Sequence, residues 1–473
     1  MKISMKKSLC FIFALALALC FIGCNGNPQG GEEPKDYVTA KTWGTVKVNS
    51  VRFDSLDNDV MPIVGYIGPT RGVTTWGDYD TGENPQYIPS LATDEMFALI
   101  EEAGVNMIAG QGDNIGYSKA EHDSILEMMD IAAEHGISYF VKDTSVINVE
   151  SGFITTENLS DAMADYINHP AFAGLYFRDE PKADVVMQNI ATATEEFYMG
   201  IGNRKLHPYV NLYPYVYYGS LAKYEEYLDA FMETEPRYIS YDHYPFTKQD
   251  GYMGPHYFTN LSVIKKYADN YKIPFWSFMQ SCGKNQDDSS LRNPTEGELI
   301  YQVNTTLAYG AKGIKWFPLF HPHYWTKSAE EGNVGLFYCD GTPTPFFDIA
   351  KRANTFIASI DHVLMNAQNV GIIYEGTSPV ATANYAAEKI QSKQFRELIK
   401  VEGASAMIGC FDYKGKTALY VVNNSISEGS TVKLTFDNKY KYDIYRESGL
   451  TQEKGTELTF EFGIGEAALV TLY

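Results

Sequence analysis

The residues best suited to chemistry lie at the end of one apolar segment, FAGLYFRDEP at 172–181. This segment predicts a buried strand that runs into Asp179 and Glu180. Pro181 ends the strand because proline cannot donate to a strand ladder. An ionised carboxylate costs several kcal/mol to bury unless it is paired or used. The pair therefore suits acid–base or nucleophilic chemistry, while a strand end held by a salt bridge to Arg178 would give the same pattern.

Polar and aromatic side chains also follow the other apolar runs of the chain. They are Asn211 and Tyr213; Asp242, His243 and Tyr244; Gln280; and Trp316, followed by a loop with His321, His323, Tyr324 and Trp325. Side chains alternate along a strand, so Asp242 and Tyr244 share one face. Aromatic faces stack on neutral sugar rings while polar neighbours hydrogen-bond the hydroxyl groups. These residues indicate a neutral, hydroxyl-rich ligand.

The elements that must position these residues alternate between apolar runs and amphipathic stretches of helical period, which predicts parallel strands joined by helices. The eight runs are 62–67, 105–110, 138–143, the 172–181 segment, 207–213, 238–244, 274–280 and 313–319. They predict an α/β fold of the (β/α)8 TIM-barrel type. The predicted barrel domain covers residues 37–365 and begins with an amino-terminal arm. An open doubly wound sheet is the alternative, although the sequence has no GxGxxG or Walker motif. In a barrel the chemistry lies at the carboxyl ends of the strands.

The character of the sequence changes after residue 365. Runs such as ALYVV, VKLTF and ALVTLY recur with turn residues between them. This pattern predicts a small C-terminal β-sandwich domain over residues 366–473.

The amino terminus has the features of a targeting segment. Lys2, Lys6 and Lys7 precede an apolar run at 9–22 that is short for a membrane span. The sequence FIGC that follows resembles a bacterial lipobox, which implies a signal peptide at 1–23, lipidation of Cys24 and a flexible tether at 24–36. A plain secretory signal is the alternative. We expect an extracytoplasmic protein held on a bacterial membrane, at its outer-membrane, periplasmic or cell-surface side, by the lipid anchor alone.

Composition narrows the range of partners. A formal net charge of -21 argues against nucleic acid, whose phosphates need basic patches. Cys282, Cys339 and Cys410 are too few and too scattered for a disulfide scaffold or a cysteine zinc site. No histidine spacing is diagnostic of a metal site. We therefore predict no metal and no cofactor, and a carbohydrate as the partner.

The order of these features resembles that of clan A glycoside hydrolases. An Asp-Glu-Pro triplet follows strand four, an aromatic polar segment follows strand six, and a tryptophan lies on strand eight. The segment GLFYCDGTPTPFFDIAKRAN at 335–354 is similar to one in barrel-type β-galactosidases and their relatives. The resemblance covers the barrel and the β domain after it, and it implies hydrolysis of a glycosidic bond.

The resemblance also implies a role for each matching residue. Glu180 would be the general acid/base that protonates the glycosidic oxygen. Asp179 would stand where many members have an asparagine that bonds the sugar 2-hydroxyl. Trp316 would form the floor beneath the sugar, Trp325 would extend it, and Tyr244 would lie near the nucleophile. The other substrate-binding candidates are Asn211, Tyr213, His243 and Gln280.

The chain departs from the clan at strand seven, where clan A enzymes carry a nucleophilic glutamate and this chain has Gln280. An amide cannot form the usual glycosyl ester. Three hypotheses follow: Asp242 pairs with Glu180 as nucleophile or base, Glu296 or Glu298 enters from the next loop, or the protein only binds glycans at a surface. We favour the first, a glycoside hydrolase that acts on an oligo- or polysaccharide, either retaining or inverting.

Overall fold

The computed structural model describes most of the chain beyond residue 40. The described residues are 41–43, 46–48, 60–69, 90–110, 119–155, 158–202, 204, 206–252, 254–283, 291–321, 335–338, 340–376 and 389–473. Cys24 and Trp325 lie outside these ranges. Within the predicted amino-terminal arm, β1 (Lys41–Trp43) and β2 (Val46–Val48) form an antiparallel hairpin.

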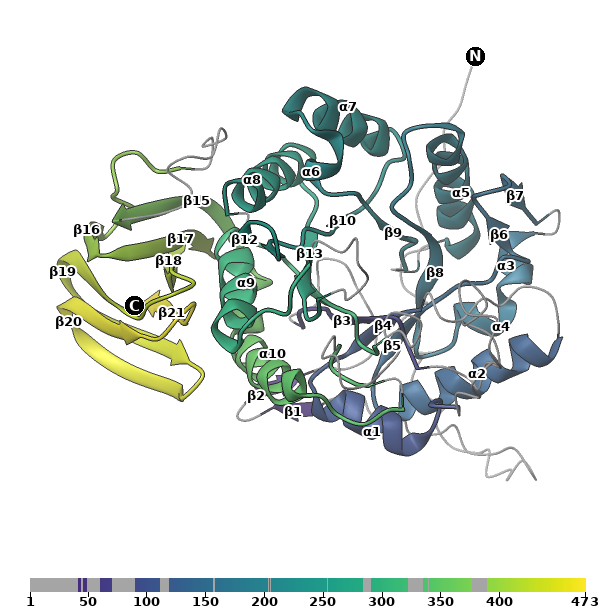
Figure 1. The fold of residues 1–473 in the computed structure, drawn as a ribbon, viewed down its shortest axis with the longest axis horizontal. Helices are drawn as coiled ribbons and strands as arrows, with labels where there is room; N and C mark the ends of the chain where they lie inside the picture. The colour runs from purple at the N-terminus through teal and green to yellow at the C-terminus, as the bar shows by residue number, and fades with distance from the viewer. Residues whose placement is uncertain are drawn as a thin grey trace, which may run out of the picture. The chain divides into compact units, whose positions relative to one another are not determined.

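Eight parallel strands form the central sheet, one for each apolar run of the sequence. They are β3 (Ile63–Tyr66), β4 (Met107–Ala109), β5 (Ser138–Val141), β8 (Phe172–Asp179), β9 (Tyr209–Asn211), β10 (Ile239–Tyr241), β13 (Phe275–Gln280) and β14 (Ile314–Phe317). Their order is β10-β13-β14-β3-β4-β5-β8-β9. A parallel bridge between Leu212 and Tyr241 joins the two end strands, and the Leu212 amide donates to the Ser240 carbonyl at 2.8 Å. The predicted barrel is confirmed, and Figure 1 shows its strands within a ring of helices.

Helices connect the strands of the barrel. They are α1 (Asp94–Glu102), α2 (Lys119–Glu134), α3 (Leu159–Ala162), α4 (Ala164–Ile167), α5 (Val185–Ile201), α6 (Tyr215–Tyr218), α7 (Leu221–Met232), α8 (Gly254–Tyr271), α9 (Glu296–Ala308) and α10 (Pro345–Leu364). Cap residues set where several of them begin. Thr93, Asp184 and Thr344 each accept a hydrogen bond from a first-turn amide, as N-cap residues do.

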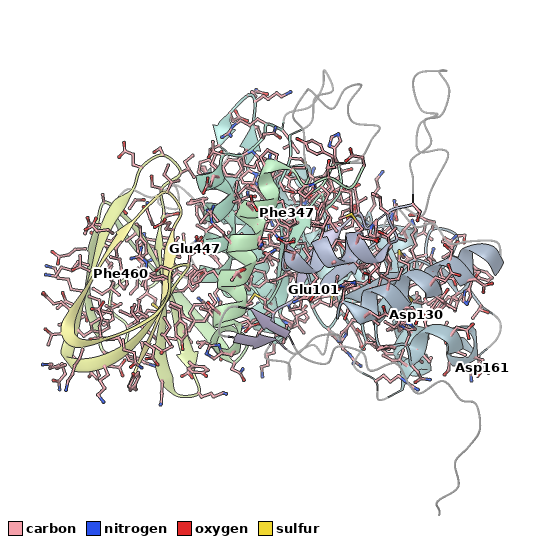
Figure 2. The ribbon with its side chains drawn as sticks, turned by 90° about the horizontal axis from the view of Figure 1, so that it is seen from below. Glu101, Asp130, Asp161, Phe347, Glu447 and Phe460 are labelled. Carbon is pink, nitrogen blue, oxygen red and sulfur yellow. The ribbon has the colours of Figure 1, made fainter. Side chains whose placement is uncertain are left out.

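Two short hairpins lie in the loops that follow β5 and β10. The hairpins are β6 (Ile147–Asn148) with β7 (Phe153–Ile154), and β11 (Phe246–Thr247) with β12 (Gly251–Tyr252). Figure 2 labels the acidic residues Glu101, Asp130 and Asp161 on α1, α2 and α3. Among the described residues, no helix is long and apolar enough to span a membrane.

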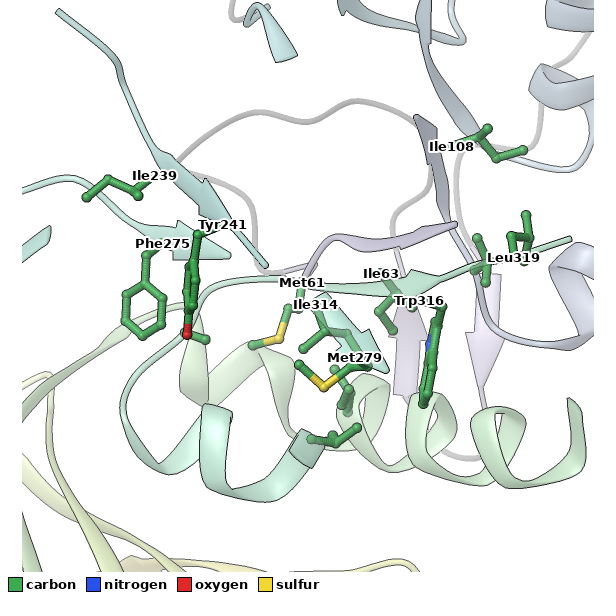
Figure 3. Close-up of a cluster of buried hydrophobic side chains, with 14 of the residues drawn as sticks. Met61, Ile63, Ile108, Ile239, Tyr241, Phe275, Met279, Ile314, Trp316 and Leu319 are labelled. Carbon is green, nitrogen blue, oxygen red and sulfur yellow. The ribbon is translucent and has the colours of Figure 1, made fainter. Parts of the chain in front are cut away.

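The barrel strands separate two apolar cores because their side chains alternate between the interior and the helices. The outer core lies between strands and helices, and Figure 3 shows part of it, including Met279 and Ile314. The inner core is rich in aromatic rings. It consists of Val64, Tyr66, Met107, Ala109, Phe140, Ala173, Tyr176, Tyr209, Tyr238, Trp276 and Phe278.

A bulge in β8 decides which way its last residues point. Tyr176 pairs with Tyr209 and Arg178 pairs with Val210, so one extra residue of β8 stands opposite β9. With regular alternation Arg178 would share the inward face of Tyr176, and Asp179 would face the helices. The extra residue reverses this order. Asp179 is thereby placed in register with Asn211, on the barrel side.

The C-terminal domain is all-β, as predicted. Its strands are β15 (Ala367–Gly376), β16 (Leu398–Gly403), β17 (Ser405–Tyr413), β18 (Lys416–Asn423), β19 (Ser430–Arg446), β20 (Gly449–Phe462) and β21 (Ala467–Leu472). They form one antiparallel sheet in the order β15-β17-β18-β21-β19-β16, with β20 on β19. Strand β16 also lies against β15 and β17, so the sheet curls around its own core.

Buried hydrogen bonds tie this domain to helix α9. The Asn304 amide donates to the Gly465 carbonyl at 2.8 Å, and the Tyr420 hydroxyl donates to Asn304 Oδ1 at 2.7 Å. The Tyr301 hydroxyl donates to Asn424 Oδ1 at 2.7 Å. Because these polar groups are paired, the junction can be buried without leaving an unsatisfied donor or acceptor among them.

Candidate functional site

Three carboxyl groups meet at the carboxyl ends of two barrel strands. Asp179 is the last residue of β8, Glu180 follows it, and Asp242 follows β10. Asp242 is buried, whereas Asp179 and Glu180 are partly accessible. Both of the latter act electrostatically on Asp242. The structure therefore brings together the three residues that the sequence predicts as catalytic.

Asn211 on β9 connects two of these carboxyl groups. Its Nδ2 donates to Asp179 Oδ1 at 3.1 Å and to Asp242 Oδ1 at 2.9 Å. Because both oxygens bond the same nitrogen, they can be at most 6.0 Å apart, the sum of these two distances. The Asn211 Oδ1 accepts from Lys315 Nζ at 2.7 Å and from Ser240 Oγ at 2.8 Å. The amide is buried and bonded on both sides, so its orientation is fixed.

Lys315 places an amine inside the aromatic barrel. Burial lowers its pKa well below the usual value, whereas the charges of Asp179 and Asp242 raise it and favour the ammonium form. Lys315 lies on β14 and is fully buried. Its ammonium group contacts Ser240 as well as Asn211, and it lies 3.8 Å from the centroid of the Phe278 ring. A ring face attracts a cation, and the amide and hydroxyl oxygens accept its hydrogen bonds. Lys315 was not among the predicted site residues, although a single charged residue within the apolar run GIKWFPL was a usable signal.

The two aspartates have different electrostatic surroundings. Burial raises the pKa of Asp242 well above its usual value, and the charges of Glu180 and Asp179 raise it further, against the effect of Lys315. Burial also raises the pKa of Asp179 above its usual value, and hydrogen bonds from Tyr66 and from the Asn211 amide, together with the charge of Lys315, offset part of that rise. The surroundings therefore favour the protonated form of Asp242 and compensate the charge of Asp179 more fully.

The backbone at Glu180 is held in an unusual conformation. Its φ is 50°, in the left-handed region, which costs a residue with a Cβ about 1–2 kcal/mol. The Glu180 amide donates to the Asn211 carbonyl at 2.8 Å. The Tyr227 hydroxyl donates to the carbonyl of Pro181, the next residue, at 2.9 Å. These two bonds hold the backbone at Glu180 and Pro181 in place.

Two pairs of aromatic rings lie close to the carboxyl groups. Tyr244 stacks on Phe317 with ring centroids 5.1 Å apart, and both residues are partly accessible. Tyr213 stacks on Tyr217 at 4.1 Å. Burial and the charge of Glu180 raise the pKa of Tyr213 to about 12. Tyr213 and Tyr244 were predicted for substrate binding, whereas Phe317 and Tyr217 were not.

Trp316 faces away from this site, which corrects its prediction as the floor beneath the sugar. It is fully buried, and its Nε1 donates to Asn354 Oδ1 on α10 at 3.0 Å. Figure 3 shows its ring directed toward the helix beside the strand. Since side chains alternate along β14, the inward positions belong to Lys315 and Phe317.

Gln280 holds loops together and leaves no group for a substrate, so its predicted binding role does not fit the structure. It is fully buried. Its Nε2 lies 3.0, 3.1 and 2.8 Å from the carbonyl oxygens of Phe246, Cys282 and Arg292. Its Oε1 accepts from the Phe246 amide at 3.0 Å. The amide thus joins the loop after β10 to the loop after β13.

His243 also points away from the carboxyl groups, against its prediction as a substrate contact. Its Nδ1 lies 3.1 Å from Asn260 Oδ1 on α8, and its ring packs against Tyr257 of the same helix. Burial lowers its pKa to about 4, which keeps the imidazole neutral. The alternation along β10 explains this position, because its neighbours Asp242 and Tyr244 face inward.

The two alternative acids are used elsewhere. Glu298 closes the capping box of α9 with Thr295 and bonds Arg292 at 2.6 Å. Glu296 bonds Arg352 of α10 at 2.6 Å. Neither carboxylate belongs to the cluster around Asn211. Across the described part of the chain, no group of three histidine, cysteine or carboxylate side chains is arranged to hold a metal ion.

The chain is similar to solved structures of glycoside hydrolases. One from Bacteroides fragilis, provisionally assigned as an alpha-galactosidase/melibiase, is 10% identical, with 88% of this chain and 79% of that chain covered and a TM-score of 0.45. A glycoside hydrolase family 5 protein from Bacteroides vulgatus is 10% identical over 80% and 84%, with a TM-score of 0.45. A beta-galactosidase from the psychrophilic Marinomonas ef1 is 11% identical over 66% and 63%, also with a TM-score of 0.45. No family model and no curated protein matches the chain. The function proposed below therefore rests on the site itself.

The surroundings of Gln280 predict that a glutamate at this position does not supply a nucleophile. In Gln280→Glu, an oxygen would replace the nitrogen that faces three carbonyl oxygens, and the new charge would be buried without a partner. We expect the free energy of unfolding at pH 7 to fall by about 3–5 kcal/mol. Urea denaturation followed by circular dichroism measures this loss.

The control for this variant is Gln188→Glu, which makes the same chemical change on the exposed surface of α5. Its unfolding free energy should remain within about 0.5 kcal/mol of the wild type. A Gln280→Glu protein as stable as that control would show that the buried amide does not hold the loops.

Proposed function

We propose that the protein is a glycoside hydrolase whose catalytic carboxyl groups are Asp179, Asp242 and Glu180. One observation carries the proposal: oxygens of Asp179 and Asp242 lie within 6.0 Å of each other, bridged by Asn211. Retaining glycosidases place their two carboxyl groups about 5–5.5 Å apart, and inverting enzymes about 6.5–9.5 Å apart. The spacing supports hydrolysis with retention of the anomeric configuration.

The surroundings of the two aspartates suggest which one is the nucleophile and which one is the general acid. Asp179, whose charge is compensated, attacks the anomeric carbon, and the proton of Asp242 goes to the leaving oxygen as the glycosidic bond breaks. Water then hydrolyses the glycosyl ester, giving one proton back to Asp242 and releasing Asp179. Glu180, the acid/base implied by the clan A resemblance, is the competing donor.

The aromatic rings suggest a neutral sugar as substrate. Tyr244 and Phe317 take the place that Trp316 was expected to fill, because their stacked rings are partly accessible and adjoin the carboxyl groups. A sugar ring can place its apolar face on such rings while its hydroxyl groups bond the acids. The excess of acidic residues at the site is unfavourable for a phosphorylated ligand.

The amino terminus supports a proposal about location. Its basic start, apolar run and FIGC sequence suit export and attachment of lipid to Cys24. The site would then meet oligo- or polysaccharides outside the cytoplasm, on the surface of a bacterial membrane. The alternative, a non-catalytic glycan-binding lipoprotein, would share the anchor and the aromatic rings but not the turnover.

Substrates with good and poor leaving groups separate the roles of the acids. In Asp242→Asn, we expect kcat/KM for natural oligosaccharides to fall about 10²–10⁴-fold, because the leaving oxygen is no longer protonated. Hydrolysis of 2,4-dinitrophenyl glycosides should fall much less, since that leaving group needs no proton. Asp179→Asn should lose activity on both. Kinetics on a glycoside panel, with NMR of the first product anomer, make the measurement.

Glu180→Gln is the matched comparison. If it, and not Asp242→Asn, shows the selective loss on natural substrates, Glu180 is the acid. Full activity in all three variants would refute the site. Binding of glycans by the wild type without any cleavage would support the binding-protein alternative.

Removal of the buried cation should move the pH profile. The Lys315 ammonium lowers the pKa of both Asp179 and Asp242, so in Lys315→Met both values rise. The ionised nucleophile then forms only at higher pH, and the protonated acid persists to higher pH. We expect both limbs of the kcat/KM profile to shift upward, measured over about pH 4–9.

Lys312→Met controls for the loss of a partly buried lysine. Lys312 lies three residues before Lys315, but its Nζ bonds the carbonyl of Leu364 at the end of α10 and that of Ala367 at the start of β15, away from the acids. This variant should lose stability while its pH profile stays in place. An unshifted profile in Lys315→Met would show that this lysine does not set the titration of the site.

Lipidation of Cys24 has its own test. In a bacterial host, the full chain should incorporate labelled palmitate and sediment with membranes, whereas Cys24→Ser should do neither because the modified thiol is missing. Cys410→Ser, which alters a buried thiol of the C-terminal sheet, is the control. Equal labelling of wild type and Cys24→Ser would leave a plain secretory signal as the explanation.

A further inference from the structure

One turn of helix beside the site is apolar yet unburied. Helix α6 has the sequence YVYY, and none of its four residues is buried. The side chains of Tyr217 and Val216 are 55% and 36% exposed. Exposed apolar surface next to a candidate active site is typical of a place where a ligand binds.

The rings of this turn extend the site outward from the carboxyl groups. Tyr217 and Tyr213 stack with centroids 4.1 Å apart and an interplanar angle of 12°. Tyr213 therefore covers one face of the Tyr217 ring. The Tyr218 ring lies in a T-shaped arrangement with it at 5.3 Å, and the side chain of Tyr217 still remains 55% exposed.

Hydrogen bonds fix the stack relative to Glu180. The Tyr227 hydroxyl accepts from the Tyr213 amide at 3.3 Å and donates to the Pro181 carbonyl at 2.9 Å. One side chain thus ties the residue after Glu180 to the start of the stack. Tyr218 packs its ring on Tyr227 at 4.7 Å. A ring platform held in this way needs little ordering when a ligand binds.

We propose that the exposed face of Tyr217, backed by Tyr213, is a binding subsite for a second sugar unit, next to the unit held at the carboxyl groups. The substrate class is then an oligosaccharide or polysaccharide, and a single sugar with a non-sugar substituent would use only part of the site. A flat ring face beside acidic groups suits a neutral sugar ring and disfavours phosphate-bearing ligands. The order of the two units rests on the proposed function, but sugar binding at Tyr217 does not.

The test compares ligands of different length. Tyr217→Ala, Tyr217→Phe and wild type would be assayed with gluco-, galacto-, manno- and xylo-oligosaccharides of two to six units and with the 4-nitrophenyl glycosides of the single sugars. Kd would be measured by calorimetry in the Asp242→Asn background. For the oligosaccharides that bind, we expect Tyr217→Ala to lower kcat/KM and weaken binding about tenfold. The 4-nitrophenyl glycosides should be unaffected, and Tyr217→Phe should behave as wild type.

Tyr271→Ala is the matched control. Tyr271 is 51% exposed and stacks on Tyr267, but it ends α8 just before β13 begins, at the opposite end of the barrel. Its loss should change neither binding nor turnover. Thermal melting would verify that each variant folds, as expected for surface tyrosines.

The outcomes separate this inference from the proposed function. If wild type cleaves oligosaccharides and Tyr217→Ala cleaves them equally well, the subsite is wrong and the hydrolase proposal stands. If wild type binds oligosaccharides without cleaving them and Tyr217→Ala loses that binding, the subsite stands and the hydrolase proposal fails. A wild-type protein that binds none of these probes overturns the subsite.

Discussion

The site depends on a charge balance inside an aromatic barrel, between the ammonium of Lys315 and the carboxyl groups of Asp179 and Asp242. Burial disfavours the charged form of all three groups, while the charges of Lys315 and of the two acids favour one another. Asn211 joins the three groups, because it donates to the two acids and accepts from Lys315. Removing Lys315, Asn211 or either aspartate leaves the charges and hydrogen-bonding groups of the others without a partner. The four side chains therefore act as one unit and not as a set of independent contacts.

The backbone of the strands around this cluster is irregular where the cluster requires it. The bulge in β8 turns Asp179 toward the barrel, and the left-handed conformation of Glu180 directs the next carboxyl group. Each irregularity is stabilised by neighbours, through the β9 register and through the bond from Tyr227 to Pro181. The strain is thus supported by the packed barrel, as expected where geometry serves chemistry.

The residue at the end of β13, Gln280, serves the fold. The Gln280 side-chain amide donates hydrogen bonds to backbone carbonyls of two loops. An ionised carboxylate could not replace it, because it has no hydrogen to donate. Phe246, Cys282 and Arg292 are thereby held together beside the end of β13. The proposed catalytic acids lie at the ends of β8 and β10, on either side of Asn211 in β9.

The sequence by itself determined the eight strands, their order along the chain and the all-β domain after them, because apolar periodicity and turn residues are local properties. It also placed Asp179, Glu180 and Asp242 at strand ends, and barrel topology brings such ends together. Only the tertiary structure decided which side chains face the mouth. Trp316 and His243 point to the helices while Lys315 and Phe317 point inward, because an offset of one residue reverses every side chain of a strand. The bulge that redirects Asp179 depends on pairing between β8 and β9, a contact between distant segments that no local pattern in the sequence records.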